Sequence, residues 1–266
     1  RRAAWLAAVA TAVWLLHPLQ ISTVFYSIQR MAQLSALFSV ASIYLYVVGR
    51  ERLAAGRGVS GWLIIALAPP VAVVGAYAKE NAALVPIALL LVEYGFFGGD
   101  QARGRAIRYL RLVMLWLPTA AIAAYLLLAL GSDGYAHRDF TAGERLMTQA
   151  RALCDYLRLL LLPAQTTTGL YNDNYTVSTG LLTPASTLPA VLGCAGLIAA
   201  ALALRRRWPL ASWGVLFFFA MHLAESTTIP LELYYEHRNY LPSAGISVAL
   251  AAALFALADY RRYIGI

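Results

Sequence analysis

The densest group of chemically competent side chains lies in residues 234–243. Glu236, His237 and Arg238 are consecutive there, and Tyr240 follows two residues later. An acid, an imidazole and a guanidinium in a row could bind and orient an anionic group such as a phosphate. Tyrosine and arginine are also typical anchors at the membrane–water interface. Composition alone therefore favours a site and an interfacial anchor equally.

Four further residues could take part in the same chemistry. His17 is either a polar cap or a ligand. Arg30 opens an apolar run, where its side chain either reaches the interface or contacts a phosphate. Lys79 is the only lysine among the 21 lysines and arginines. It either closes a local pair with Glu80 or offers a point charge to an anion, with Glu80 orienting it.

The sequence predicts no metal site. The four histidines are scattered without zinc-ligand spacing. Asp173, in the turn-rich segment 171–175, is interpreted as a turn former, with a cation ligand as the alternative. Nucleotide-binding glycine motifs and a serine elbow are absent from the sequence. Cys154 falls near a predicted membrane edge and Cys194 inside an apolar run, so no bridge between them is expected.

Composition identifies the class of protein that positions these side chains. Of the 266 residues, 61% are hydrophobic and only 13% are charged, and the mean hydropathy is +0.64. These values are typical of an all-α polytopic membrane protein, which we expect to form a single transmembrane domain over residues 1–266. The net charge of +8 does not indicate nucleic acid, because the arginines form short clusters between apolar runs.

Eight apolar runs predict eight membrane crossings. Arginine clusters fall at every second boundary, so the positive-inside rule puts both ends of the chain in the cytoplasm and the candidate residues on the outer side. Between the fifth and sixth runs, apolar residues at helical spacing over 144–162 predict an amphipathic interfacial helix. The last run is expected to begin as a helix at Pro242 or Ser243. The runs are 3–16, 31–48, 61–78, 82–97, 111–130, 185–204, 209–224 and 242–258.

Three motifs then resemble a known family. In order, spacing and loop side they are similar to the membrane domain of bacterial tetratricopeptide-repeat membrane proteins. Those proteins resemble the transmembrane and tetratricopeptide-repeat O-mannosyltransferases of the GT-C glycosyltransferase superfold. The motifs are His17-Pro18-Leu19-Gln20 with Tyr26, Gln29-Arg30-Met31 and Leu34 to Phe38; Lys79-Glu80-Asn81; and Glu236 to Gly245.

The resemblance implies an enzyme of the bacterial cytoplasmic (inner) membrane. Such an enzyme moves a sugar from a polyprenyl-phosphate carrier to a hydroxyl, here of a protein serine or threonine, on the periplasmic side. The family's catalytic acid lies in an earlier external loop, expected upstream of Arg1, and its repeats would follow Ile266. The chain is then the middle of a membrane domain, and its catalytic residue stays unassigned.

The same resemblance implies a substrate site built from outer-side residues. We hypothesise that Arg238 and Lys79 bind the donor phosphate, while Glu236 and Glu80 hold these cations in place. The lipid-linked sugar is the one donor implied, and a divalent metal has no support from the residues. The implied substrate-binding residues are His17, Arg30, Lys79, Glu80, Glu236, His237, Arg238 and Tyr240.

Two other functions compete with the enzyme. The chain could be a non-catalytic membrane anchor or assembly subunit that scaffolds a partner complex, with the same charges forming structural ion pairs. A transporter is less favoured, because the runs place no charge in the middle of a predicted crossing. An upstream external loop with an acidic pair would favour the enzyme over the scaffold.

Overall fold

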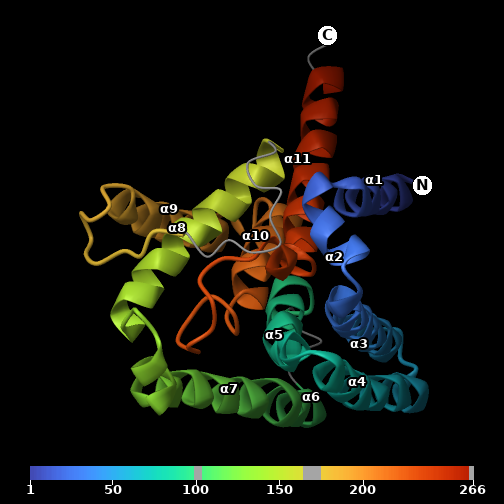
Figure 1. The fold of residues 1–266 in the computed structure, drawn as a ribbon. Coiled ribbons are helices and arrows are strands. Elements are labelled where there is room, and N and C mark those ends of the chain that lie inside the picture. The colour runs from blue at the N-terminus through green and yellow to red at the C-terminus, as the bar shows by residue number, and fades with distance from the viewer. Residues whose placement is uncertain (99–103, 164–174, 264–266) are drawn as a thin grey trace. The chain divides into compact units, whose positions relative to one another are not determined.

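A computed structural model describes residues 1–98, 104–163 and 175–263 of the chain. These residues form helices joined by loops, and they contain no named strand beyond one isolated bridge, between Gly180 and Thr183. Figure 1 shows the helices coloured along the chain. Asp173, considered above as a cation ligand, lies outside the described residues. The chain divides into two compact units.

The first unit comprises residues 1–22, 143–222 and 232–266. Its core lies around Tyr156 and Phe218, both fully buried. Two of its helices begin at a proline, Pro209 and Pro242. The first amide groups of a helix have no acceptor within the helix, so the missing amide proton of proline breaks no hydrogen bond there. The helices are α1 (Arg2–Leu16), α8 (Ala142–Leu161), α9 (Thr187–Leu204), α10 (Pro209–Met221) and α11 (Pro242–Tyr263), with 3-10 turns η1 (Pro18–Gln20) and η8 (Glu236–Asn239).

Helices α10 and α11 approach each other closely through two glycines. A Cβ atom added at Gly214 would clash with the carbonyl oxygen of Gly245, and one added at Gly245 would clash with that of Gly214. Small residues allow helix backbones to pack this tightly in membrane proteins, where van der Waals contact drives association. The two backbones are therefore held against each other at this crossing.

The second unit comprises residues 23–142 and 223–231. Its main contact is between two long helices, where Gly49 and Gly61 again remove side chains from the interface. Ser42 adds a hydrogen bond of 2.8 Å to the carbonyl of Ala68. The helices are α3 (Arg30–Ala54), α4 (Gly58–Ala78), α5 (Val85–Phe96), α6 (Arg105–Leu110) and α7 (Leu117–Leu128), with a π-helical turn Arg111–Trp116 and 3-10 turns Ser27–Gln29, η3 (Glu80–Leu84), Ala129–Gly131 and Asp133–His137; α2 (Ile21–Phe25) joins the units along the chain.

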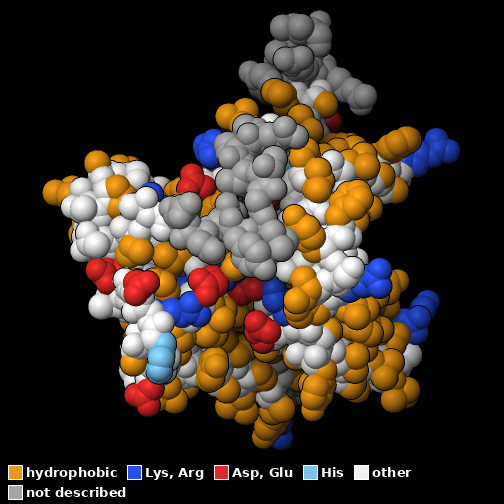
Figure 2. All heavy atoms as spheres, viewed as in Figure 1, with side chains coloured by type: hydrophobic (Ala, Val, Ile, Leu, Met, Phe, Trp, Pro, Cys, Tyr) orange, Lys and Arg blue, Asp and Glu red, His pale blue; other side chains and the backbone are white. Residues whose placement is uncertain are grey.

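Among the residues that the structure describes, five helices are long and apolar enough to cross a membrane, and there are six spans if α1 and the bent segment after it count as one. Large apolar side chains are exposed along them, and hydrophobic atoms cover much of the face in Figure 2. The chain is therefore an all-α multi-pass membrane protein. The five spans are Ser27–Ala54, Gly58–Ala78, Arg105–Gly131, Thr187–Leu204 and Pro242–Asp259, and the bent pair is Arg2–Leu16 with Pro18–Phe25.

The two remaining predicted crossings are shorter helices. The run 82–97 is not one helix, because η3 occupies its start and α5 begins only at Val85, with Pro86 in its first turn. The run 209–224 ends as a helix at Met221, after 13 residues. At 1.5 Å per residue that is about 20 Å, short of the roughly 30 Å of a hydrocarbon core.

The predicted helix over 144–162 and the predicted start of the last helix are confirmed, whereas the interfacial position of the first of them stays a prediction. Helix α8 covers 142–161 and buries one side, which includes Arg145, Ala152 and Tyr156. Helix α11 begins at Pro242.

Candidate functional site

The predicted site residues divide between the two units. The first unit brings His17 together with the 236–240 motif, since η1 packs against η8. Arg30, Lys79 and Glu80 belong to the second unit, where Arg30 and Glu80 are exposed. Each group is therefore built within its own unit.

Hydrogen bonds fix the contact between the first and third motifs. Gln20 Nε2 donates to Ser243 Oγ at 2.9 Å. Trp14 Nε1 donates to the carbonyl of Tyr240 at 2.7 Å, and the two rings lie 5.1 Å apart between centroids. Burial raises the pKa of Tyr240, so its phenol stays neutral at ordinary pH. The start of α11 is thereby tied to the end of α1.

His17 acts as the polar cap that the sequence offered as one alternative. Its Nδ1 accepts from the amide of Leu19 at 3.2 Å. An accepting Nδ1 leaves the proton on Nε2, which lies 3.2 Å from the carbonyl of Leu160 and can donate to it. Both ring nitrogens are thus engaged in holding the turn after α1.

Arg238 is buried, at 5% exposure, and its guanidinium is fixed from two directions. Its Nη1 donates to the carbonyl of Glu232 at 2.8 Å, and its guanidinium lies 5.3 Å from the centroid of the Tyr235 ring. His237 stacks on the same ring, with centroids 5.1 Å apart. The rings of Tyr235 and His237 and the guanidinium of Arg238 are thus packed together in this turn.

Arg145 brings a second guanidinium to the same place. Its Nη1 lies 3.3 Å from the carbonyl oxygen of Glu232 that Arg238 also contacts, and it is fully buried. The sequence pattern predicts for Arg145 only a place on an amphipathic interfacial helix. No signal in the sequence distinguishes Arg145 from the other arginines of this helix, because only the tertiary fold brings it to the 232–238 loop. Two buried cations therefore converge on one carbonyl oxygen.

The hydroxyl of Tyr156 fastens the same loop to α8. It donates to the carbonyl of Tyr235 and lies 3.0 Å from the amide of Tyr235 as well. Tyr234 stacks beside it at 4.7 Å, and burial raises the Tyr234 pKa. His222, 1% exposed, stacks on the other side at 5.7 Å. Residues 234 and 235 are consequently held in an aromatic cluster.

In the second unit Lys79 pairs with an acid that the sequence analysis did not consider. Its Nζ lies 2.6 Å from Glu225 Oε1, with both side chains largely buried. Asn81 Nδ2 donates to the other carboxylate oxygen at 3.0 Å. The predicted orienting residue, Glu80, is exposed in the turn that starts η3. The Lys79-Glu80-Asn81 motif therefore reaches Glu225 through its first and third residues.

A second charged cluster lies among the helices of this unit. Glu93 is fully buried and accepts two bonds of 2.8 Å from Arg50, one of 2.9 Å from Arg111 and one of 2.8 Å from Tyr46. Arg50 and Glu93 lie within α3 and α5, and the spacing of the apolar runs in the sequence does not indicate that they pair. An unpaired charge in an apolar segment has a large free-energy cost, and the Glu93 carboxylate is paired with two guanidiniums.

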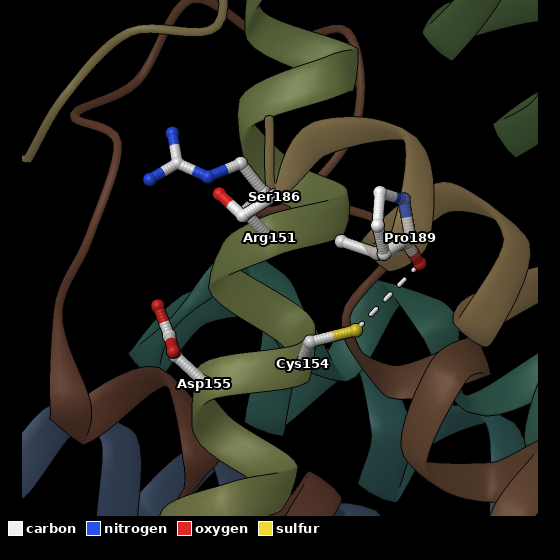
Figure 3. A pocket seen from close by; sticks show the side chains of 6 residues that line it. Arg151, Cys154, Asp155, Ser186 and Pro189 are labelled. Carbon is white, nitrogen blue, oxygen red and sulfur yellow. Dashed lines mark hydrogen bonds between the residues drawn. The ribbon is translucent and has the colours of Figure 1, made fainter. Parts of the chain in front are cut away.

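One cavity of about 350 Å³ opens on the first unit, beside α8 and the start of α9. In Figure 3 the Cys154 side chain points toward α9, while Asp155 points away from it. The cavity is lined by Arg151, Cys154, Asp155, Ser186, Pro189 and Ala190.

Within the described ranges, no three histidine, cysteine or acidic side chains lie close enough to hold a metal ion. Comparisons with protein-family models, curated proteins and solved structures gave no match.

Proposed function

We propose that this chain is the membrane domain of a glycosyltransferase that moves a sugar from a polyprenyl-phosphate carrier to a hydroxyl, of a protein serine or threonine, outside the cytoplasm. The observation that carries the proposal is the convergence of Arg145 and Arg238 on the Glu232 carbonyl. Of these residues, Arg238 belongs to the motif that resembles the GT-C family, and Arg145 lies on α8. The proposed enzyme sits in the bacterial inner membrane with both ends of this chain in the cytoplasm.

The chemistry explains why two fixed cations would be needed. Transfer breaks the bond between the anomeric carbon and the lipid phosphate, and negative charge develops on the phosphate as it leaves. Guanidinium groups bind phosphate oxygens through paired N–H donors. Arg145 and Arg238, already positioned and buried, can stabilise that charge without further ordering. The acceptor hydroxyl must lose a proton, and no residue is assigned as its base.

The other predicted residues differ in how well their contacts support a role in the proposed site. His17, Gln20 and Tyr240 position the 236–240 motif, which is a structural role within the proposed site. Lys79 belongs to the other unit, where it pairs with Glu225, so its role as a phosphate ligand stays a prediction from the family resemblance. The proposal requires eight crossings of the GT-C kind, with α5 and α10 crossing despite their lengths of 12 and 13 residues.

A membrane scaffold is the second candidate, and one observation favours it. The Lys79–Glu225 pair and the Glu93 cluster are saturated by contacts within the chain. A protein that only anchors a partner complex needs such internal pairs and no catalytic cations. Repeats or partners would then supply the activity.

Sugar transfer in membranes that carry the complete protein separates the two candidates. Arg238→Gln, Arg145→Gln and Lys79→Gln are compared with Arg206→Gln, an exposed arginine in the turn after α9. We expect loss of transfer of about 100-fold for Arg238→Gln, since one removed donor costs that much in comparable sites, and no loss for Arg206→Gln. Full transfer by a well-folded Arg238→Gln/Lys79→Gln double variant would exclude these two residues as donor-phosphate ligands. Absence of transfer by the unaltered protein, with a partner complex retained, would favour the scaffold.

A further inference from the structure

The two cysteines of the chain meet between α8 and α9. Cys154 Sγ lies 3.7 Å from Cys194 Sγ, and both are free thiols. Their places in the sequence gave no sign of this proximity, because 154 belongs to an interfacial helix and 194 to an apolar span. Two sulfurs in van der Waals contact need to approach by less than 2 Å to reach the bond length of about 2.05 Å.

The thiols are held in place from both sides. Cys154 Sγ donates to the carbonyl of Ala190 at 3.6 Å, drawn as the dashed line in Figure 3. Cys194 Sγ lies 3.6 Å from the carbonyl of Ala150 in return. Each sulfur thus contacts the backbone of the opposite helix four residues before its partner cysteine. The hydrogen bond with Cys194 also lowers the pKa of the Cys154 thiol, which favours the nucleophilic thiolate.

A reagent can reach this pair. Cys154 is half-buried and forms part of the wall of the 350 Å³ cavity. Arg151 and Ser186 lie on the same wall, so the cavity has a polar rim. A small disulfide that enters the cavity therefore meets Cys154 first, because Cys194 is not among the residues that line it.

We propose that Cys154 and Cys194 are a modification site that forms an intramolecular disulfide linking α8 to α9. Cys154 thiolate attacks a disulfide of an exchange partner and displaces one of its thiols. Cys194 then loses its proton and attacks Cys154 in the mixed disulfide, which displaces the second thiol. One Sγ–Sγ bond forms, two S–H bonds are lost, and the partner disulfide takes up both electrons and both protons to become two thiols.

The consequence is a covalent attachment of the interfacial helix to a membrane span. The bond closes a loop that begins in α8 and ends in α9. Closing a long loop restricts the unfolded chain and so stabilises the folded one. The proposal uses contacts within the first unit only and does not depend on the proposed glycosyl transfer.

Oxidised glutathione is the probe that tests the proposal. The protein in native membranes is treated with it, denatured, and alkylated with a maleimide reagent large enough to shift its mobility on a gel. We expect the untreated reduced protein to gain two adducts and the oxidised protein none, with both restored by dithiothreitol. The oxidised form should also unfold at a temperature higher by about 5 °C or more.

Single variants provide the matched controls, because Cys154→Ser and Cys194→Ser each leave one sulfur without its partner. Cys194→Ser leaves Cys154, which lines the cavity, so it should end as a stable mixed disulfide with glutathione. Cys154→Ser leaves Cys194, which does not line the cavity, so it should react with glutathione much more slowly. Two adducts on the oxidised wild-type protein would overturn the proposal. A glutathione adduct that persists on the wild-type protein, or a disulfide between two chains, would overturn it as well.

Discussion

Lys79 and Glu225 form a buried ion pair, with 2.6 Å between Nζ and Oε1. The two residues belong to the same compact unit although the chain from 143 to 222 separates them. Asn81 shares the carboxylate, and Ser35 Oγ donates to the carbonyl of Lys79 at 3.1 Å. This arrangement ties the turn before η3 to the loop after α10.

Breaking this pair should destabilise the protein. Removal of one partner from a buried pair costs about 3–5 kcal/mol, because the other charge is left without compensation. We expect Lys79→Met and Glu225→Gln to lower the unfolding temperature in detergent, measured by tryptophan fluorescence. Glu80→Gln is the matched control, since its side chain is exposed in the neighbouring position. Equal effects of Glu80→Gln and Glu225→Gln would contradict the pairing.

The Glu93 cluster predicts two very different effects. Glu93→Gln removes the charge that compensates Arg50 and Arg111, so we expect a loss of more than about 3 kcal/mol in the free energy of unfolding. Tyr46→Phe removes one hydrogen bond and should cost about 1 kcal/mol. Glu51→Gln, at an exposed position of α3, should change little. Denaturant titration of the purified variants measures all three, and a Glu93→Gln variant as stable as Glu51→Gln would refute the role of Glu93.

The crossing of α10 and α11 predicts a strict size limit. Gly214→Val puts two methyl groups and a Cβ against the backbone of Gly245, and overpacking of this kind costs about 1–3 kcal/mol. Gly196→Val is the control in α9, where no neighbouring atom lies within 4 Å of an added Cβ. The difference in unfolding temperature between the two variants measures the effect of the close contact, because both substitutions change the helix propensity similarly. A smaller loss for Gly214→Val than for Gly196→Val would rule the close approach out.

Whether α10 crosses the membrane can be measured directly. In a background without native cysteines, Arg206→Cys and Glu232→Cys place exposed thiols before and after this helix. We expect a membrane-impermeant maleimide added outside to label the second thiol and not the first. Labelling of both after detergent addition is the control. Labelling of both thiols from one side would show that the 13-residue helix turns back.

Local patterns allowed several elements to be predicted. The apolar spacing of 144–162 identified α8 to within two residues at each end, because a half-buried helix leaves its period in the sequence. Pro242 indicated the start of α11, since the first turn is the position in a helix where proline is best tolerated. The break before Val85 was missed because the residues from 82 onward are apolar on both sides of it.

The partners within the site could not be predicted. Glu225 was expected in a loop, and nothing in its neighbourhood distinguishes it from other acids as the partner of Lys79. Arg145 has the same chemistry as the other arginines of α8, and only the tertiary fold directs it to the Glu232 carbonyl. Contacts between residues far apart along the chain depend on packing, which a single sequence does not display.

The order in which the Glu93 cluster is synthesised has a consequence for biogenesis. Arg50 leaves the ribosome before Glu93, and Arg111 leaves it 18 residues after Glu93. When α5 reaches the bilayer, its carboxylate can already meet a guanidinium on α3, so a charge that hydrocarbon would reject can be inserted in neutralised form. Arg111 then arrives as the second cation and completes the cluster well before Glu225, the partner of Lys79 in the same unit, is synthesised.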